Sequence, residues 1–191
     1  MNEEQKTLKW WRLFPNYLTL FRIAVVPILL VLYPLGIYWE ISQIKVFCAL
    51  LFAIAALTDW LDGYIARKYK LESKVGALLD PIADKMLTAS ALVLVASAQN
   101  LWAWMAGLLL CREIAISGLR LVALQHNFEI KVHFLAKIKT ICLGVALTCL
   151  MVNYPLFGWP FEEVGMISIW LALVFSLISI WIYVKKLMDE I

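Results

Sequence analysis

Charged residues and histidine are scarce in this sequence. Asp, Glu, Lys and Arg make up 16% of the 191 residues and there are two histidines, whereas roughly a quarter of an average soluble protein is charged. Cysteine is also rare, and its four occurrences lie in apolar runs without the spacing of a zinc site. These shortages argue against a disulfide framework and against a zinc centre. We interpret the cysteines as small apolar side chains; they are Cys48, Cys111, Cys142 and Cys149.

Apolar residues dominate what is present. They account for 63% of the chain, and the mean hydropathy is +0.82. The net charge of +3 is small and its basic residues gather at the ends of apolar segments, which favours a membrane surface over nucleic acid as a partner. The length suffices for about six spans of roughly 20 residues each. We therefore predict one membrane domain, residues 1–191, in contact with the lipid bilayer.

The apolar segments predict an all-α integral membrane protein with six transmembrane helices. The stretch before the first span is charged and then aromatic, which predicts an N-terminal amphipathic segment on the membrane surface. A cleaved signal peptide is the alternative, although no A-x-A site follows the apolar run. Pro15 stands just ahead of the first span and suits the start of a helix. The spans are expected at residues 17–38, 44–70, 75–97, 102–120, 134–151 and 164–184.

Four aspartates interrupt this apolar pattern in two consecutive spans. Asp59 and Asp62 are three residues apart and Asp80 and Asp84 are four apart, so each pair shares one face of a helix. An ionised side chain at membrane depth costs roughly 2.5 to 3.5 kcal/mol, so the four acids need compensation. Pairing with nearby Lys and Arg is one possibility. Carboxylates without His or Cys are also the ligands that Mg²⁺, Mn²⁺ or Ca²⁺ prefers over Zn²⁺.

Gly63 and Arg67 lie between the two acid pairs and are themselves four residues apart. A glycine allows a ligand to approach the backbone closely, and a guanidinium can bind a phosphate through two parallel hydrogen bonds. Together with the aspartates, these residues predict a metal-dependent site for a diphosphate.

The same stretch carries a resemblance to a known family. The spacing Asp59-x2-Asp62-Gly63-x2-Ala66-Arg67-x8-Gly76-x3-Asp80-x3-Asp84 resembles the full signature of the CDP-alcohol phosphatidyltransferases, with no departure at any signature position. Members of that family are integral membrane enzymes that move a phosphatidyl group from a CDP-linked lipid to an alcohol and release CMP. The resemblance therefore implies a transferase of phospholipid biosynthesis, and it implies a homodimer.

The family motif assigns roles to the matching residues of this chain. It implies two ions, Mg²⁺ or Mn²⁺, one held by Asp59, Asp62 and Asp80 and the other by Asp59, Asp80 and Asp84. It makes Asp84 the general base toward the acceptor hydroxyl. The CDP moiety of the lipid substrate is expected at four further residues, which are Gly63, Ala66, Arg67 and Ser73.

Polar residues also open the first span. Asn16, Thr19 and Arg22 are spaced by three, which places an amide, a hydroxyl and a guanidinium on one face of a helix. This entry resembles bacterial members of the family, in which the first span helps to cover the nucleotide lipid. The alternative is that Arg22 extends to the membrane interface and Asn16 caps the helix.

Cations gather near the ends of the fourth and fifth spans. They are Arg112, Arg120, Lys137 and Lys139. The surrounding stretches, Arg112-Glu113-Ile114-Ala115-Ile116-Ser117-Gly118-Leu119-Arg120 and Lys137-Ile138-Lys139-Thr140, resemble the branch of the family that uses sn-glycerol 3-phosphate as acceptor. A second anion pocket for the acceptor phosphate would explain these cations. The alternative is that Arg112 and Glu113 pair with charges on neighbouring helices.

Charges in the connecting segments predict the orientation. Lysine and arginine are concentrated before the first span, between the second and third, between the fourth and fifth, and after the sixth. By the positive-inside rule, both termini and the active face are expected in the cytoplasm, and the resemblance to bacterial members implies the inner membrane.

Three other functions compete with a glycerol-3-phosphate phosphatidyltransferase. Within the family, a cardiolipin, phosphatidylserine or inositol-phosphate transferase would share the aspartates. Membrane prenyltransferases also use Asp-rich helices, but their motifs lack the Gly-x2-Ala-Arg element. A divalent-cation transporter should place its acids near the bilayer midplane, whereas the four acids here lie toward one face.

Overall fold

The computed structural model describes residues 3–69, 74–125, 134–154 and 158–190. Within these ranges, the side chains of residues 3–16, 59–69, 74–78, 120–125, 136 and 186–190 are not described.

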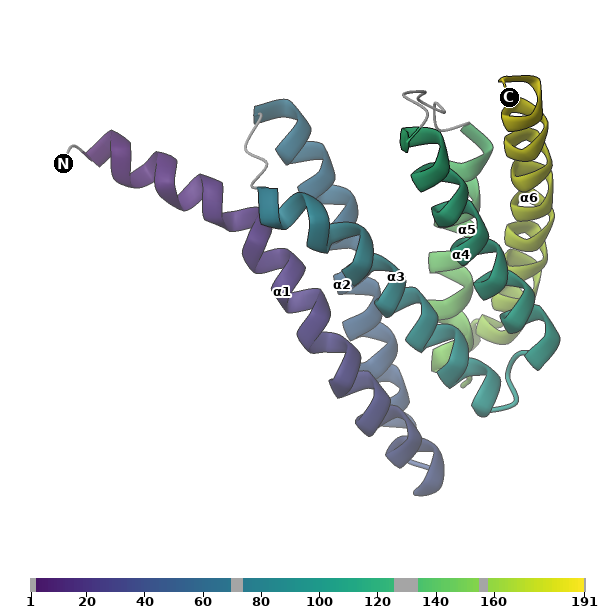
Figure 1. Cartoon of the computed structure of the whole chain (residues 1–191). Helices are drawn as coiled ribbons and strands as arrows, with labels where there is room; N and C mark the ends of the chain where they lie inside the picture. Colours follow the sequence, from purple (N-terminus) through teal and green to yellow (C-terminus); the bar gives the residue numbers. More distant parts are fainter. Residues whose placement is uncertain (1–2, 70–73, 126–133, 155–157, 191) are drawn as a thin grey trace. The chain divides into compact units, whose positions relative to one another are not determined.

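The described chain is helical, as the sequence predicted, and contains no β-strand in those ranges. Within the described ranges, six helices follow one another (Figure 1). Their bounds agree with the expected spans to within a few residues over most of the chain. The helices are α1 (Glu3–Tyr38), α2 (Ser42–Tyr69), α3 (Lys74–Ser97), α4 (Ala103–Gln125), α5 (Phe134–Val152) and α6 (Phe161–Glu190).

The start of α1 corrects one prediction. Pro15 was expected at the beginning of the first helix, but α1 begins at Glu3 and includes Pro15 in its interior. A proline inside a helix removes one backbone donor and bends the axis without necessarily ending the helix, and α1 is bent in Figure 1. The segment expected on the membrane surface is thus continuous with the first apolar helix.

The chain divides into two compact units, residues 1–91 and 92–191. In the first unit, α1 packs against α2. Gly36 allows a close approach there, because a Cβ at this position would lie 2.9 Å from Cγ2 of Ile44 at the start of α2. The core of this unit is apolar and includes Leu29, Tyr33 and Phe52, each at most 2% exposed.

In the second unit, α6 packs against both α4 and α5. The approach of α5 and α6 depends on Gly165, where an added Cβ would lie 2.8 Å from both Cγ and Cδ2 of Leu150. Two turns are also joined by side chains: Asn100 donates through Nδ2 to the carbonyl of Leu150 (3.1 Å), and Asn153 donates through Nδ2 to Oδ1 of Asn100 (2.7 Å). These bonds fix one end of the unit.

Two helices of the chain end in the same kind of turn. After α1, Glu40 has a φ of 54° and the N–H of Ile41 donates to the carbonyl of Gly36. After α3, Gln99 has a φ of 60° and the N–H of Asn100 donates to the carbonyl of Val95. A left-handed residue followed by this backward bond is the Schellman ending. It reverses the chain within a few residues, and after α1 it allows α2 to return alongside α1.

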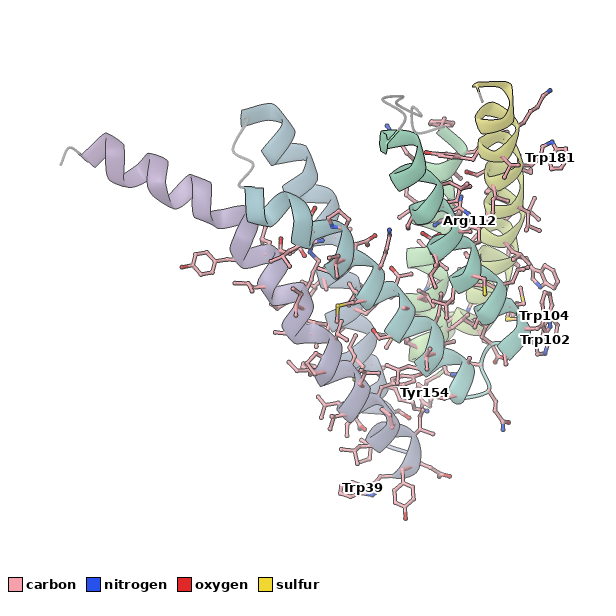
Figure 2. All side chains as sticks on the ribbon, viewed as in Figure 1. Trp39, Trp102, Trp104, Arg112, Tyr154 and Trp181 are labelled. Carbon is pink, nitrogen blue, oxygen red and sulfur yellow. The ribbon has the colours of Figure 1, made fainter. Side chains whose placement is uncertain are left out.

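The outer faces of the helices are apolar. Leu57, Ile114 and Trp181 are 64%, 71% and 73% exposed, and Figure 2 shows Trp181, Trp102 and Trp104 directed away from the helices. Among the described residues, Tyr17–Tyr38 and Phe161–Lys185 are long and apolar enough to cross a membrane, and Ser42–Thr58 is a shorter apolar stretch. That all six helices cross the membrane remains a prediction.

Candidate functional site

Asp80 is held by two side chains of α1. Arg22 donates through Nη2 to Oδ1 of Asp80 at 2.5 Å, and Thr19 donates through Oγ1 to the same oxygen at 3.3 Å. Arg22 is completely buried and Thr19 is 3% exposed, whereas the side chain of Asp80 is 40% exposed. The contact joins residues 58 positions apart in the sequence. A buried cation therefore holds one oxygen of an accessible carboxylate.

These contacts show where the side chains of Thr19 and Arg22 meet. Their spacing placed both on one face of the first helix, and the structure agrees, because both reach the same oxygen of Asp80. They were expected to touch the CDP-linked lipid, and Arg22 was alternatively expected at the membrane interface. Its complete burial contradicts the interfacial alternative. The side chain of Asn16 lies outside the described ones.

The four predicted metal ligands lie on α2 and α3. Asp80 and Asp84 are one turn apart on α3, and the side chain of Asp84 is partly exposed. The helix continues through Pro81. Asp59 and Asp62 belong to the last part of α2, where the backbone is helical and the side chains are not described.

The residues expected at the CDP moiety follow the first acid pair. Gly63, Ala66 and Arg67 continue the helical backbone of α2, without described side chains, and Ser73 lies outside the described residues. Their assignment stays a prediction from the motif.

The side chains present fit a divalent cation as far as they are described. Both contacts made by Asp80 fall on Oδ1, so among the described residues its Oδ2 is left for another ligand. Ligating carboxylates in proteins are commonly hydrogen-bonded through their other oxygen in this way. Among the described side chains, no three of the His, Cys, Asp and Glu type are grouped closely enough to hold a metal. The side chains of Asp59 and Asp62 are not among the described ones.

A second polar cluster joins the three helices of the second unit. Glu113 of α4 accepts hydrogen bonds at Oε1 from Arg112 Nη1 (2.9 Å) and from Lys139 Nζ of α5. Arg112 also donates through Nε to the carbonyl of Ser176 on α6 at 3.3 Å. Arg112, labelled in Figure 2, and Lys139 are 6% and 4% exposed. This is a buried ion-pair network.

Of the four predicted acceptor-binding cations, the structure brings two together. Arg112 and Lys139 share Glu113, while Lys137 is exposed on α5. The side chain of Arg120, toward the end of α4, is not described. The pairing of Glu113 with a cation on a neighbouring helix is the alternative that the sequence left open. Adjacent residues on a helix do not share a face, so the spacing of Arg112 and Glu113 alone could not reveal their bond.

A comparison with protein families identifies the chain. Residues 12–178 match the family described as CDP-alcohol phosphatidyltransferase. The chain belongs to this family. The matched region runs through both compact units and contains every candidate site residue from Asn16 to Lys139.

Several relatives within the CDP-alcohol phosphatidyltransferase family are named for one reaction, as CDP-diacylglycerol–glycerol-3-phosphate 3-phosphatidyltransferases. The Bacillus subtilis (strain 168) protein is 35% identical over 183 residues, covering 90% of this chain and 93% of the relative. The Blochmanniella floridana protein is 38% identical, with 89% and 88% covered. The Salmonella choleraesuis (strain SC-B67) protein is 40% identical over 142 residues, with 72% and 75% covered. The similarity thus extends over nearly the whole chain.

Proposed function

We propose that this protein transfers the phosphatidyl group of CDP-diacylglycerol to sn-glycerol 3-phosphate, giving phosphatidylglycerophosphate and CMP. The observation that carries the proposal is the similarity to relatives named for this reaction, which covers about nine tenths of both chains. The complete aspartate signature on α2 and α3 supports the same chemistry.

The aspartates would hold the metal ions of this reaction. In our proposal, Asp59, Asp62 and Asp80 hold one Mg²⁺ or Mn²⁺, and Asp59, Asp80 and Asp84 hold a second. Bound there, the ions would neutralise negative charge on the diphosphate and on the departing CMP. Among the described residues, Oδ2 of Asp80 is left open, which supports this assignment.

Other residues of the first unit would bind the CDP moiety or orient the side chain of Asp80. Arg67 would bind a phosphate of the CDP moiety, with Gly63, Ala66 and Ser73 beside it. Arg22 and Thr19 would keep Asp80 in one rotamer through their bonds to Oδ1, which is a positioning role. Together with Asn16, these two residues would also help to cover the CDP-linked lipid, as the resemblance of the first span implies.

Asp84 would accept the proton of the acceptor hydroxyl. The hydroxyl oxygen then forms a bond to the phosphorus that carries the diacylglycerol, and the bond from that phosphorus to the oxygen of CMP breaks. Arg112, Arg120, Lys137 and Lys139 would bind the phosphate of the acceptor through charge-assisted hydrogen bonds. The need for a second phosphate site is what distinguishes this acceptor from serine or unphosphorylated glycerol.

We further propose that all six helices cross the bacterial inner membrane and that the protein works as a homodimer. The exposed apolar faces of the described helices support contact with lipid or with a second copy. The lysines and arginines at alternate connections support a cytoplasmic active face.

Release of CMP by the purified protein tests the reaction. The protein is supplied with CDP-diacylglycerol and, in separate reactions, with glycerol 3-phosphate, glycerol, serine and inositol phosphate. We expect turnover with glycerol 3-phosphate, loss of turnover with excess chelator, and recovery with Mg²⁺ or Mn²⁺. Full activity in chelator would refute the metal assignment, and transfer only to another acceptor would place the chain in a different branch of the family.

Kinetics of the cation variants test the acceptor site. A charge-assisted hydrogen bond contributes roughly 1.5 to 3 kcal/mol, so Arg112→Ala, Arg120→Ala, Lys137→Ala and Lys139→Ala should each weaken the use of glycerol 3-phosphate about ten- to a hundredfold. The KM for CDP-diacylglycerol should change little. Equal damage toward both substrates would mean that these cations support the fold or the lipid head group.

A further inference from the structure

Glu113 occupies the position between two buried cations where an anion is needed. Its Oε1 accepts from both Arg112 and Lys139, whose side chains are 6% and 5% exposed, compared with 23% for Glu113. Buried charges are strongly unfavourable unless they are paired. Without this carboxylate, the two cations on α4 and α5 would repel each other.

The network is not saturated. Arg112 directs Nη1 to Glu113 and Nε to the carbonyl of Ser176, while its Nη2 is buried without a hydrogen-bond partner in the described part of the chain. A buried guanidinium N–H without an acceptor is costly. One donor of Arg112 is thus open to an additional acceptor next to the bond with Glu113.

We propose that Glu113 is an internal counter-ion that takes the place of the acceptor phosphate in the free enzyme and competes with it. This inference rests on the proposed function, in which Arg112 and Lys139 bind that phosphate. A phosphate oxygen approaching Nη2 of Arg112 brings a like charge beside the carboxylate. Phosphate carries up to two negative charges and several acceptor oxygens, so it can satisfy both cations and displace Glu113 from them.

The competition makes Glu113 a determinant of acceptor affinity. The carboxylate keeps α4 and α5 joined when the site is empty, and its displacement opposes phosphate binding. Replacing it with glutamine preserves the shape and removes the competing charge. Glu113→Gln should therefore be less stable than the unmodified protein without phosphate, and phosphate should restore more of its stability.

The test uses the full chain in detergent, without CDP-diacylglycerol, so that no turnover occurs. Thermal unfolding is followed while inorganic phosphate or glycerol 3-phosphate is added to the unmodified protein, to Glu113→Gln and to Glu163→Gln, a control that changes an exposed glutamate in the first turn of α6. We expect phosphate to bind Glu113→Gln about tenfold more tightly than the unmodified protein, and Glu163→Gln to behave as unmodified. In the kinetic assay, the KM for glycerol 3-phosphate should fall and that for CDP-diacylglycerol should stay the same.

Equal or weaker phosphate binding by Glu113→Gln would overturn the proposal and make Glu113 a structural partner of the two cations. The absence of phosphate binding by either protein would also overturn it. If Glu113→Gln does not fold, Glu113→Asp replaces it: the shorter side chain withdraws from the cations, so tighter phosphate binding supports competition and unchanged or weaker binding refutes it. The acceptor panel tests the proposed function separately, since it uses the unmodified enzyme and CMP release.

Discussion

At the scale of single residues, the contact between Arg22 and Asp80 shows how the first helix serves a carboxylate on the third. The side chain of Arg22 is buried and that of Asp80 is partly exposed. The positive charge of Arg22 is therefore neutralised by a carboxylate that a ligand can still reach. A carboxylate whose one oxygen is held in this way is restricted in rotation. We therefore expect the orientation of Asp80 to depend on α1.

The strengths of the two bonds to Asp80 should differ. Arg22→Met removes a 2.5 Å bond from a charged donor, and Thr19→Val removes a 3.3 Å bond from a neutral hydroxyl. We expect Arg22→Met to lower the free energy of unfolding by roughly 1.5 to 3 kcal/mol and Thr19→Val by under about 1 kcal/mol. Chemical or thermal unfolding of both variants in detergent measures which of them loses more unfolding free energy. A larger loss for Thr19→Val would contradict it.

Asp84 carries the second residue-scale prediction. If Asp84 is the general base that we propose, Asp84→Asn should reduce kcat by about 10² to 10⁴. Binding of CDP-diacylglycerol should persist, because Asp59, Asp62 and Asp80 would still hold one ion. Glu163→Gln, an exposed acid-to-amide change, is the matched control. Normal turnover of Asp84→Asn would remove Asp84 from the mechanism.

At the scale of helices, close packing depends on where the glycines lie. Gly165 of α6 faces Leu150 of α5, which is 1% exposed and has no room to move away. Gly144 of α5 meets nothing within 4 Å of an added Cβ. Two glycines on neighbouring helices thus have opposite surroundings, which makes them a matched pair for substitution.

We expect Gly165→Ala to destabilise the second unit and Gly144→Ala to leave it unchanged or stabilise it. Overpacking typically costs about 1 to 3 kcal/mol, whereas replacing a helical glycine in open surroundings contributes about 0.4 to 1 kcal/mol. Thermal unfolding of the two variants measures both effects. A Gly165→Ala protein as stable as Gly144→Ala would show that α5 and α6 can separate freely.

At the scale of the whole molecule, the orientation in the membrane can be tested at opposite ends of α3. The sequence around Ser73 is rich in lysine, and the connection that contains Gln99 carries no charged residue. The 24 residues of α3 correspond to roughly 36 Å of helix, enough to cross the hydrocarbon core. The positive-inside rule then puts Ser73 in the cytoplasm and Gln99 outside.

Single cysteines at these two positions, in a cysteine-free background, should react from opposite sides. An impermeant thiol reagent added to intact cells should label the cysteine at position 99 and should label the one at position 73 only after the membrane is opened. Labelling of position 73 in intact cells would reverse the orientation, and labelling of both would show that α3 does not cross the bilayer.

The helical class, the approximate bounds of most helices and the motif could be predicted from the sequence, because each depends on residues close together along the chain. Apolar runs of helix-spanning length and acids spaced by three or four carry that information locally. The start of α1 was mispredicted, because Pro15 suits both a helix start and a bend. The metal and acceptor sites remain predictions.

Only the tertiary structure decided which charges meet. Arg22 lies 58 residues from Asp80, and Glu113 lies 26 residues from Lys139, and no local period specifies such pairs. These pairs form because a buried charge without water is strongly unfavourable unless an opposite charge on a neighbouring helix lies within reach. The sequence determined that these charged residues lie within apolar helices. The packing of the helices determined which charged residues pair: α1 lies near α3, and α4 and α5 pack against α6.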